Sequence, residues 1–201
     1  MTKPVLTVSD DVLAALVNGI TSLRDKALIL VLAESGLRLG EVAGLDRTSI
    51  ASKSHVLPDG TVRIIGRGQA VECKWRGKIR DFLVGPLAMA AIDEYLMTVR
   101  CDDNRAPMFL SADGGRLDSR SIGNIIRKLT NRLGLTAIHI YGLRYGLVLR
   151  LFKAGSSPCI IRGLLGYSRD RSFEEILPPT EDTLISEYLR AIASLPWYQK
   201  S

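Results

Sequence analysis

The chain has 201 residues, of which 46% are hydrophobic and 24% are charged. These proportions are typical of a globular protein and exclude a fibrous or disordered one. Every apolar run is shorter than a membrane span, and the N-terminus lacks the basic-then-apolar pattern of a signal peptide. We therefore expect a cytoplasmic protein with no membrane partner, nucleoid-associated if its source is prokaryotic. A formal net charge of +6 is compatible with a polyanionic partner but does not establish one.

The cysteines give no sign of disulfides or of a metal site. Cys73, Cys101 and Cys159 are scattered, odd in number and not at metal-ligand spacing. We expect them to be buried thiols, and we expect no metal or other cofactor. The length suits one domain with a real core, spanning residues 1–201.

Two helices and a small sheet are predicted in the first half of the chain. Ser9 and Asp10 are cap candidates within the helical segment 7–16, and a second apolar-periodic run, at 22–36, ends on a glycine. The texture then changes to short β-like runs separated by turn residues. These runs predict an antiparallel sheet with strands at residues 61–66, 70–75 and 79–85.

Helical patterns return after the sheet and continue to the C-terminus. Ser119 is a candidate cap for one helix, and Pro158 suits the first turn of another. The polar segment 168–182, with two adjacent prolines, is expected to form a loop. The expected helices span residues 86–99, 119–134, 141–155, 156–166 and 183–195. The fold class is therefore mixed α+β and mainly helical.

Two arginines stand out from this pattern. Arg144 lies in a helix whose wide apolar surface should be buried, and a buried guanidinium needs a partner. That partner would be a carboxylate of this chain or a phosphate held through two parallel hydrogen bonds. Arg38 follows a helix-ending glycine, and its simplest partner is Glu34 or Glu41, both at helix-neighbour spacing.

In combination and order, four segments resemble the catalytic domain of the tyrosine recombinases, the phage integrase family. The segment "SGLRLGEVAGL" resembles the family pattern T-G-L-R-x-x-E-x-x-x-L, and "YGLRYG" resembles H-x-L-R-H, with Arg144 as the second arginine. The segment "LLGY" is similar to the L-G-H/W pattern, and "TLISEYLRAI" to the segment that carries the nucleophile. The first pattern is matched at Gly36, Leu37, Arg38, Glu41 and Leu45.

The resemblance covers nearly the whole chain. It implies the fold shared with type IB topoisomerases, with a small antiparallel three-stranded sheet. It also implies that the family's usual N-terminal core-binding domain is absent here, either trimmed or naturally missing. Without that domain, binding to DNA would be weak and strongly salt-dependent.

The family's chemistry assigns roles to the matching residues. Tyr188 would attack a DNA phosphodiester, forming a 3′-phosphotyrosine bond without metal or ATP. Arg38 and Arg144 would stabilise the charge of the transition state. Tyr141 and Tyr167 would donate hydrogen bonds in place of the family's histidine and its histidine or tryptophan, since a phenol can donate but titrates near ~10 rather than ~6.5. Nearby His139 could compensate or be merely structural.

Two further roles follow from the resemblance. The leaving 5′ oxygen takes its proton from a hairpin lysine in this family, and the segment "VECKWRGKIRDFLV" offers Lys74 and Lys78. Strand alternation favours Lys74, because it projects away from the expected core face. Glu41 would orient an arginine from behind rather than react.

The nucleophile is the least regular match. It usually follows the L-G-H/W pattern by about nine positions, where this chain has Ile176, and Tyr188 comes twelve residues later. A charged, proline-rich insertion would account for the difference. Tyr198, in "PWYQKS", is the reserve candidate.

The predicted function is site-specific DNA recombination through strand cleavage and rejoining. The expected partner is double-stranded DNA, bound by a tetramer on two DNA sites, with the C-terminal segment docked on a neighbouring subunit and a monomer in free solution. The alternatives are a catalytically impaired DNA-binding protein of the same fold, a type IB topoisomerase-like enzyme, or a protein whose two arginines form structural ion pairs. Five basic residues on or before one expected helix either follow the DNA backbone or form a solvated face. They are Arg116, Arg120, Arg127, Lys128 and Arg132.

Overall fold

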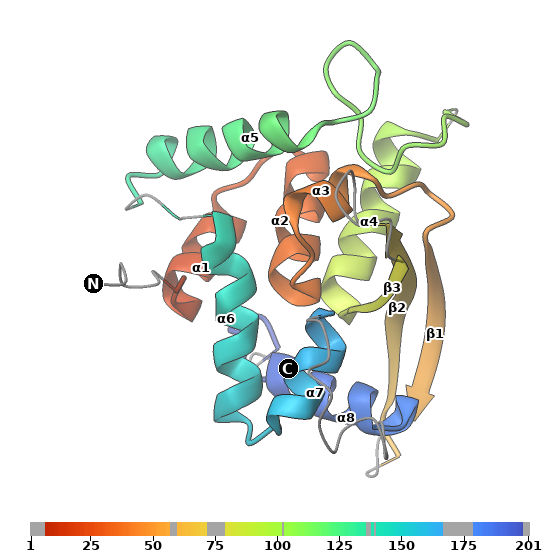
Figure 1. Ribbon diagram of the computed structural model, residues 1–201. Helices are drawn as coiled ribbons and strands as arrows, with labels where there is room; N and C mark the ends of the chain where they lie inside the picture. Colours follow the sequence, from red (N-terminus) through yellow and green to blue (C-terminus); the bar gives the residue numbers. More distant parts are fainter. Residues whose placement is uncertain are drawn as a thin grey trace.

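The computed structural model describes residues 7–56, 60–71, 79–101, 103–135, 138, 140–166 and 179–198. Helices surround a central helix, and a small sheet lies along one side (Figure 1). This architecture confirms the mixed, mainly helical fold class. In chain order the elements are α1 (Asp10–Asn18), α2 (Leu23–Ser35), α3 (Leu39–Ala43), β1 (Ile50–Val56), β2 (Val62–Val71), β3 (Ile79–Val84), α4 (Pro86–Val99), α5 (Ser119–Arg132), α6 (Ile140–Lys153), α7 (Pro158–Leu165) and α8 (Glu181–Ile192).

Helix boundaries follow the capping chemistry of the sequence. The Ser9 side chain accepts the amide of Val12 at the start of α1, and Ser157 does the same for α7, with Pro158 in the first turn. Helix α2 ends at Gly36, whose φ of 61° is the left-handed conformation that glycine adopts without strain.

Three expectations about helices were wrong in detail. The cap of α5 is Asp118 rather than Ser119, because the aspartate accepts the amide of Ser121. The short helix α3 was not predicted, since five residues carry too little periodicity to register. Helix α8 begins at Glu181, inside the expected loop, where Thr180 caps it; the part of that loop at 168–178 lies outside the described residues.

As predicted, the described sheet is antiparallel and three-stranded, and its order is β1-β2-β3. The strands themselves differ from those expected. The expected strand 61–66 and the start of the strand at 70–75 form one long strand, β2. The first strand, β1, was missed because it is a polar edge strand with only Ile50 and His55 partly buried.

Glycines in β2 explain the misplaced break. Gly66 and Gly68 look like turn residues in the sequence, yet both are paired within the ladder. A Cβ on Gly66 would lie 2.3 Å from the sulfur of Met89, and one on Gly68 would lie 2.2 Å from the Ser49 carbonyl oxygen. Glycine is therefore used here for close approach of neighbouring chain segments rather than for a turn.

Helix α2 forms the centre of the core. Every residue from Ala27 to Ser35 is buried, and the helix packs against α4, α6 and β3. Figure 1 shows α2 between α1 and α4, with α6 beside it. Because no face of this segment reaches solvent, Glu34 lies in the core and its partners must come from other elements.

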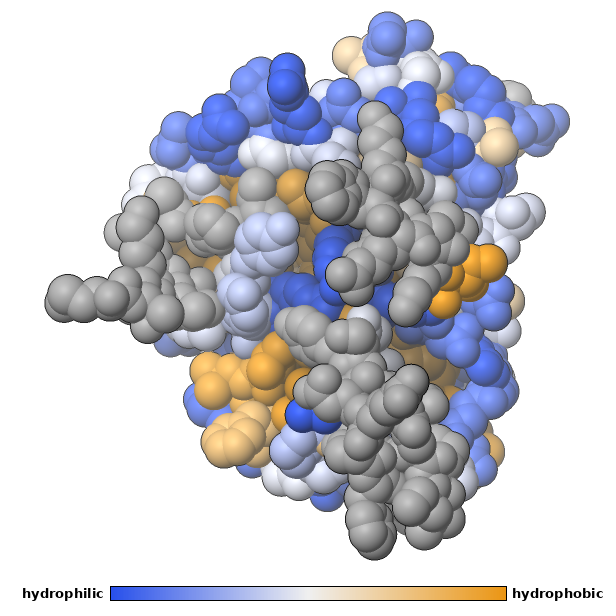
Figure 2. Space-filling view, in the orientation of Figure 1, coloured by the Kyte–Doolittle hydropathy of each residue, from blue (hydrophilic) through white to orange (hydrophobic). Residues whose placement is uncertain are grey.

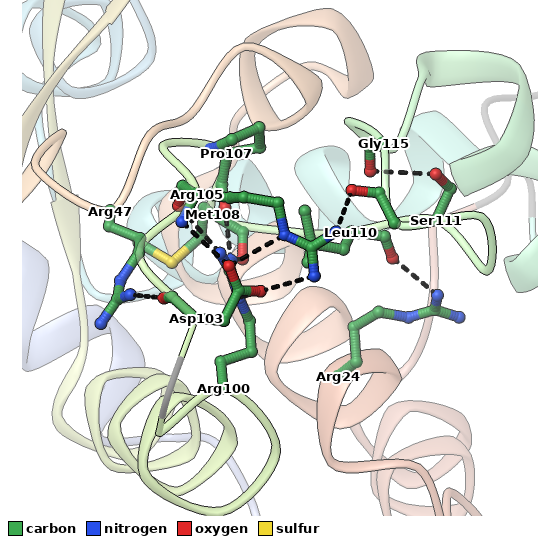
Figure 3. Close-up of polar contacts among 11 residues, drawn as sticks. Arg24, Arg47, Arg100, Asp103, Arg105, Pro107, Met108, Leu110, Ser111 and Gly115 are labelled. Carbon is green, nitrogen blue, oxygen red and sulfur yellow. Dashed lines mark hydrogen bonds and ion pairs between the residues drawn. The ribbon is translucent and has the colours of Figure 1, made fainter.

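A buried arginine also organises the loop that follows α4. Arg100 is 2% exposed and donates to the carbonyl oxygens of Arg105, Pro107 and Met108, and its Nε lies 3.0 Å from Asp103 Oδ2 (Figure 3). These bonds hold the segment 103–110 against the helix end.

Two smaller findings concern the cysteines and hydropathy. Cys101 is exposed and Cys159 is partly buried, and both are free, so the expectation of buried thiols was wrong for Cys101, while Cys73 lies outside the described residues. Within the described ranges, no helix combines the length and apolarity that crossing a membrane requires.

Candidate functional site

Arg144 is buried, as the sequence predicted, and its partners are backbone carbonyls. It is 4% exposed and projects from α6 toward the end of α2. One terminal nitrogen donates to the carbonyl oxygen of Gly36, and the other donates to that of Leu165 at 2.7 Å. These two bonds fix the orientation of the guanidinium against the end of α2 and the end of α7.

Arg38 and Glu41 lie at the start of α3, directly after the turn at Gly36. Arg38 precedes the first residue of the helix, and its backbone amide donates to Glu41 Oε2 at 2.6 Å. Its side chain is 32% exposed, and Nη1 lies 3.3 Å from Glu41 Oε1. Of the two carboxylates considered for Arg38, the structure therefore supports Glu41, and Glu34 has other partners.

Glu41 is held more strongly by an arginine that sequence reasoning missed. Arg80 on β3 places Nε 2.6 Å from Oε1 and Nη2 2.9 Å from Oε2, a fork-on-fork ion pair. The Glu41 side chain is 1% exposed and that of Arg80 11%. The arginine contacts and the Arg38 amide bond keep the pKa of Glu41 below its usual value, against burial, which raises it. The carboxylate therefore stays ionised.

Strand alternation would have found Arg80. In β3 the residues at alternate positions, Arg80, Phe82 and Val84, turn toward the interior, and an arginine on the core side of a strand needs a buried partner. The sequence prediction gave a functional role to a hairpin lysine and none to any residue of the expected strand at 79–85.

These residues bring three distant segments together. Gly36 and Arg38 come from the end of α2 and the start of α3, Arg80 comes from the sheet, and Leu165 ends α7, just before the glycine that precedes Tyr167. Three of the four predicted motifs thus converge around one cluster of arginines. Among the described residues, this cluster holds Arg38, Arg80 and Arg144 together with the carboxylate of Glu41.

Several other predicted site residues lie at the surface or outside the described residues. Tyr141 is 51% exposed on α6, one turn before Arg144, with its ring centroid 6.4 Å from that of Tyr145. This location puts it at the surface beside the arginine cluster. The predicted residues Lys74, Lys78, His139 and Tyr167 lie outside the described residues.

Tyr188 lies in the core on α8. It is 1% exposed, and no hydrogen bond of ordinary geometry reaches its hydroxyl oxygen within the described structure. Burial and the nearby carboxylate of Glu34 raise the pKa of Tyr188 well above its ordinary value, although Arg150 and the Gly85 amide oppose that shift. In this conformation the predicted nucleophile is enclosed, so DNA could reach it only if α8 moved.

Glu34 joins the C-terminal segment to the core beside Tyr188. Its Oε1 accepts the indole N–H of Trp197 and the hydroxyl of Tyr198, each at 3.0 Å, and its Oε2 accepts the amide of Ala88 at 3.2 Å. Tyr198 in turn accepts the amide of Leu87 at 2.8 Å. The first-turn amides of α4 are thus capped by Glu34 and by the reserve nucleophile candidate.

The protonation of Glu34 is set by burial. It is fully buried, and this raises its pKa from 4.5 to about 7, despite the opposing hydrogen bonds from Trp197, Tyr198 and Ala88 and the nearby charge of Arg150. The C-terminal segment therefore rests on a group that changes charge near neutral pH.

The basic residues near α5 have mixed surroundings. Arg116 donates to the carbonyl oxygens of Ala43 and Leu45 and pairs with Asp46, so it braces the chain beyond α3. Arg132 donates to the Gly19 carbonyl oxygen at 2.9 Å. The surface over α5 is hydrophilic, whereas an apolar area lies over the C-terminal half of α6, where Leu149 and Phe152 are exposed (Figure 2).

Comparisons with known proteins agree with this arrangement. Residues 7–175 match the model of the phage integrase family. The chain is 29% identical over 170 residues to the tyrosine recombinase XerC of Pelobacter propionicus, covering 84% of this chain and 52% of that protein. It is 31% identical over 157 residues to the tyrosine recombinase XerD of Mycobacterium tuberculosis, covering 75% and 46%. The chain thus spans about half the length of the curated relatives it matches.

Solved structures show the same fold. The crystal structure of XerA recombinase superposes with a TM-score of 0.65 at 23% identity, covering 94% of this chain and 66% of that chain. The integrase from mycobacterium phage Brujita gives a TM-score of 0.65 at 17% identity, covering 95% and 58%. The sequence match, the ordered motifs and the shared fold lead to one conclusion: the chain belongs to the phage integrase family of tyrosine recombinases.

Proposed function

We propose that this chain is the catalytic domain of a site-specific DNA recombinase, which cleaves and rejoins DNA through a 3′-phosphotyrosine intermediate. The observation that carries the proposal is the convergence of Arg38 and Arg144 at the turn after α2. Arg144 is anchored on the Gly36 carbonyl oxygen, two residues before Arg38, so its position is fixed by the backbone segment that carries Arg38. Preorganised cations of this kind stabilise a phosphate transition state without reorganisation.

In the proposed reaction a tyrosine hydroxyl oxygen attacks the scissile phosphorus, and its proton is released to water. The bond from phosphorus to the tyrosine oxygen forms as the bond to the 5′ oxygen breaks, and the phosphotyrosine keeps the bond available for rejoining. Arg38 and Arg144 bind the non-bridging oxygens, and Tyr141 and Tyr167 donate hydrogen bonds to the same phosphate. Lys74, or alternatively Lys78, gives a proton to the leaving 5′ oxygen.

Tyr188 is the proposed nucleophile, with Tyr198 in reserve. Both hydroxyl groups are withdrawn from solvent: that of Tyr188 lies in the core, and that of Tyr198 bonds to Glu34 and to the α4 amide. Attack therefore requires α8 and the C-terminal segment to move when DNA binds. The proposed assembly is a tetramer that holds two double-stranded DNA sites, formed from chains that are monomeric in free solution.

The proposal is tested with a nicked suicide DNA substrate, on which rejoining fails and a covalent adduct accumulates. Adduct formation without added metal is followed on a denaturing gel for the wild type, Tyr188→Phe, Tyr198→Phe and Arg38→Ala. Tyr95→Phe is a matched control, because Tyr95 is also buried but has no proposed role. We expect the adduct to disappear in Tyr188→Phe and to form about a hundredfold more slowly in Arg38→Ala.

Each other outcome has a defined meaning. Loss of the adduct in Tyr198→Phe alone would move the nucleophile to that residue. A wild type that binds DNA and never forms an adduct would refute the catalytic proposal and support a binding protein of the same fold. Relaxation of supercoiled DNA by the isolated monomer would instead support a topoisomerase-like activity.

A further inference from the structure

Arg80 is a partly buried arginine on β3, and its side chain is 11% exposed. Arg80 occupies the interior side of a strand whose neighbours on that side are apolar. Ordering its long side chain in the interior costs conformational entropy and desolvation, so its contacts must offset both. Two of those contacts are to Glu41, in the cluster of Arg38, Arg80 and Arg144.

Arg80 takes both oxygens of Glu41. Its Nε and Nη2 bind Oε1 and Oε2 at 2.6 and 2.9 Å, whereas Nη1 of Arg38 lies 3.3 Å from Oε1 of the same carboxylate. The two contacts to Arg80 are thus shorter and bidentate. Glu41 still orients Arg38 through the 2.6 Å bond from the Arg38 backbone amide.

Arg80 also contacts the end of α7. Its Nη1 donates to the carbonyl oxygen of Leu164 at 3.2 Å. Gly166, with a φ of 64°, packs so closely that a Cβ there would lie 2.2 Å from Arg80 Cδ. The side chain therefore links β3, the start of α3 and the segment just before Tyr167.

We propose that Arg80 is a positioning residue: by pairing with both Glu41 oxygens, it lets Glu41 hold the Arg38 backbone while Arg38 directs its guanidinium to a DNA phosphate. This inference rests on the proposed function for the identity of the phosphate. It adds a role for a strand residue that acts through Glu41 and does not itself touch the substrate.

The role follows from what happens when Arg80 is removed. Glu41 is buried and its charge must be compensated, and the Arg38 side chain is a second cation in contact with it. In Arg80→Met the carboxylate would draw the Arg38 side chain inward and away from the phosphate. A displacement of about 1 Å is enough to slow a reaction about a hundredfold. Removing the carboxylate as well should free Arg38 again.

The test compares Arg80→Met, Arg80→Lys and the double variant Glu41→Gln/Arg80→Met in the full chain. Adduct formation on the suicide substrate and binding to a short DNA duplex at low salt are measured, with the folded fraction checked by thermal unfolding. Arg105→Met is the charge-matched control, since Arg105 bonds to Asp103 and to the Gly114 carbonyl oxygen. The double variant has the same net charge as the wild type.

We expect Arg80→Met to lose about a hundredfold in adduct rate and the double variant to recover about tenfold or more of that loss. Arg80→Lys should be intermediate, because lysine keeps the charge but cannot form the bidentate pair. Arg105→Met should match the wild type. A double variant no faster than Arg80→Met, at equal folded fraction, would overturn the proposal.

A pH profile separates positioning from a structural role. The contacts of Arg80 lower the pKa of Glu41, and burial raises it. Without Arg80 the carboxyl group should protonate more readily, so the Arg80→Met rate should approach that of the wild type as pH falls from about 8 to about 6. A constant ratio of the two rates across this range would indicate a purely structural defect and would overturn the proposal.

The binding assay keeps this test separate from the proposed function. If the wild type binds duplex DNA but forms no adduct, the catalytic proposal fails. The positioning role of Arg80 is then tested by DNA binding alone. Arg80→Met should then bind about tenfold more weakly than the equally charged Arg105→Met, and the double variant should recover. Equal binding by the two single variants would overturn the proposal. A wild type that neither binds nor cleaves DNA would overturn both proposals.

Discussion

Glu34 should make the stability of this protein fall as pH rises through neutrality. Its folded-state pKa is about 7, above the ordinary value of 4.5. Between these values the folded protein binds more protons than the unfolded chain, so the free energy of unfolding decreases with rising pH. The difference between about 7 and 4.5 corresponds to about 3 kcal/mol, lost progressively from about pH 4.5 to just above pH 7.

Glu34→Gln removes this titration but costs a hydrogen bond. The carboxylate accepts from Trp197 and Tyr198 on one oxygen and from Ala88 on the other. An amide has one oxygen, so at least one buried donor loses its acceptor, at a cost of about 1–3 kcal/mol. The variant should therefore be less stable than the wild type at about pH 5, and within about 2 kcal/mol of it at about pH 8, where the wild type carries the buried charge.

The assay is urea unfolding at several pH values between 5 and 8, followed by circular dichroism. Glu94→Gln is the matched control, because Glu94 is exposed on α4, and it should keep the decline of the wild type. Stability of the wild type that does not change across this range would refute the argument, as would an undiminished decline in Glu34→Gln.

Other substitutions test the same core and the arginine cluster by chemical denaturation. Tyr188→Phe removes a buried hydroxyl that makes no hydrogen bond of ordinary geometry with the described residues, so it should leave the free energy of unfolding unchanged or raise it by about 1 kcal/mol, whereas a clear loss of stability would refute this expectation. Tyr198→Phe loses the bonds of its hydroxyl and should cost about 1–3 kcal/mol; no loss would mean the bonds are weak. Gly85→Ala places a Cβ 2.4 Å from Glu34 Oε2 and should cost about 1–3 kcal/mol, unless the carboxylate can shift. Arg144→Met leaves two carbonyl oxygens without their donor and should cost at least about 2 kcal/mol, and a smaller cost would argue that water replaces it.

The sequence predicted the helices well because their signals are local. The expected range 86–99 matches α4, and the glycine that ends α2 was correctly identified. The sheet was less predictable, since β1 is a polar edge strand and the glycines of β2 are used for packing rather than turning. Pairing between strands is a tertiary property, and strand propensity alone does not report it.

The buried network around Glu34 was also beyond prediction. Glu34 precedes the motif glycine by two residues and read as a possible partner of Arg38. Two of its hydrogen-bond partners, Trp197 and Tyr198, lie more than 160 residues away in the chain. The apolar run of α2 is typical of a buried helix, but which distant segment supplies partners for Glu34 is a tertiary property that the sequence of the helix does not contain.

Burial of an arginine does not by itself indicate a phosphate site, because the three arginines that are buried among the described residues have different partners. Arg100, Arg144 and Arg150 are 2%, 4% and 4% exposed. Arg100 holds its own loop through carbonyl oxygens and an aspartate, and Arg150 pairs with Asp10 at 2.9 Å.

Arg144 differs from the other two in which backbone it holds. Its two carbonyl partners belong to the turn before Arg38 and to the residue that ends α7, so it connects the segments that carry the other motif residues. A buried guanidinium that joins several motif segments is positioned to act on whatever those segments bind, whereas one that braces a single loop is not. The order of the motifs in the sequence predicted Arg144 as a candidate site residue. Its bonds to the Gly36 and Leu165 carbonyl oxygens give that prediction a physical basis, because they fix the guanidinium between the motif segments.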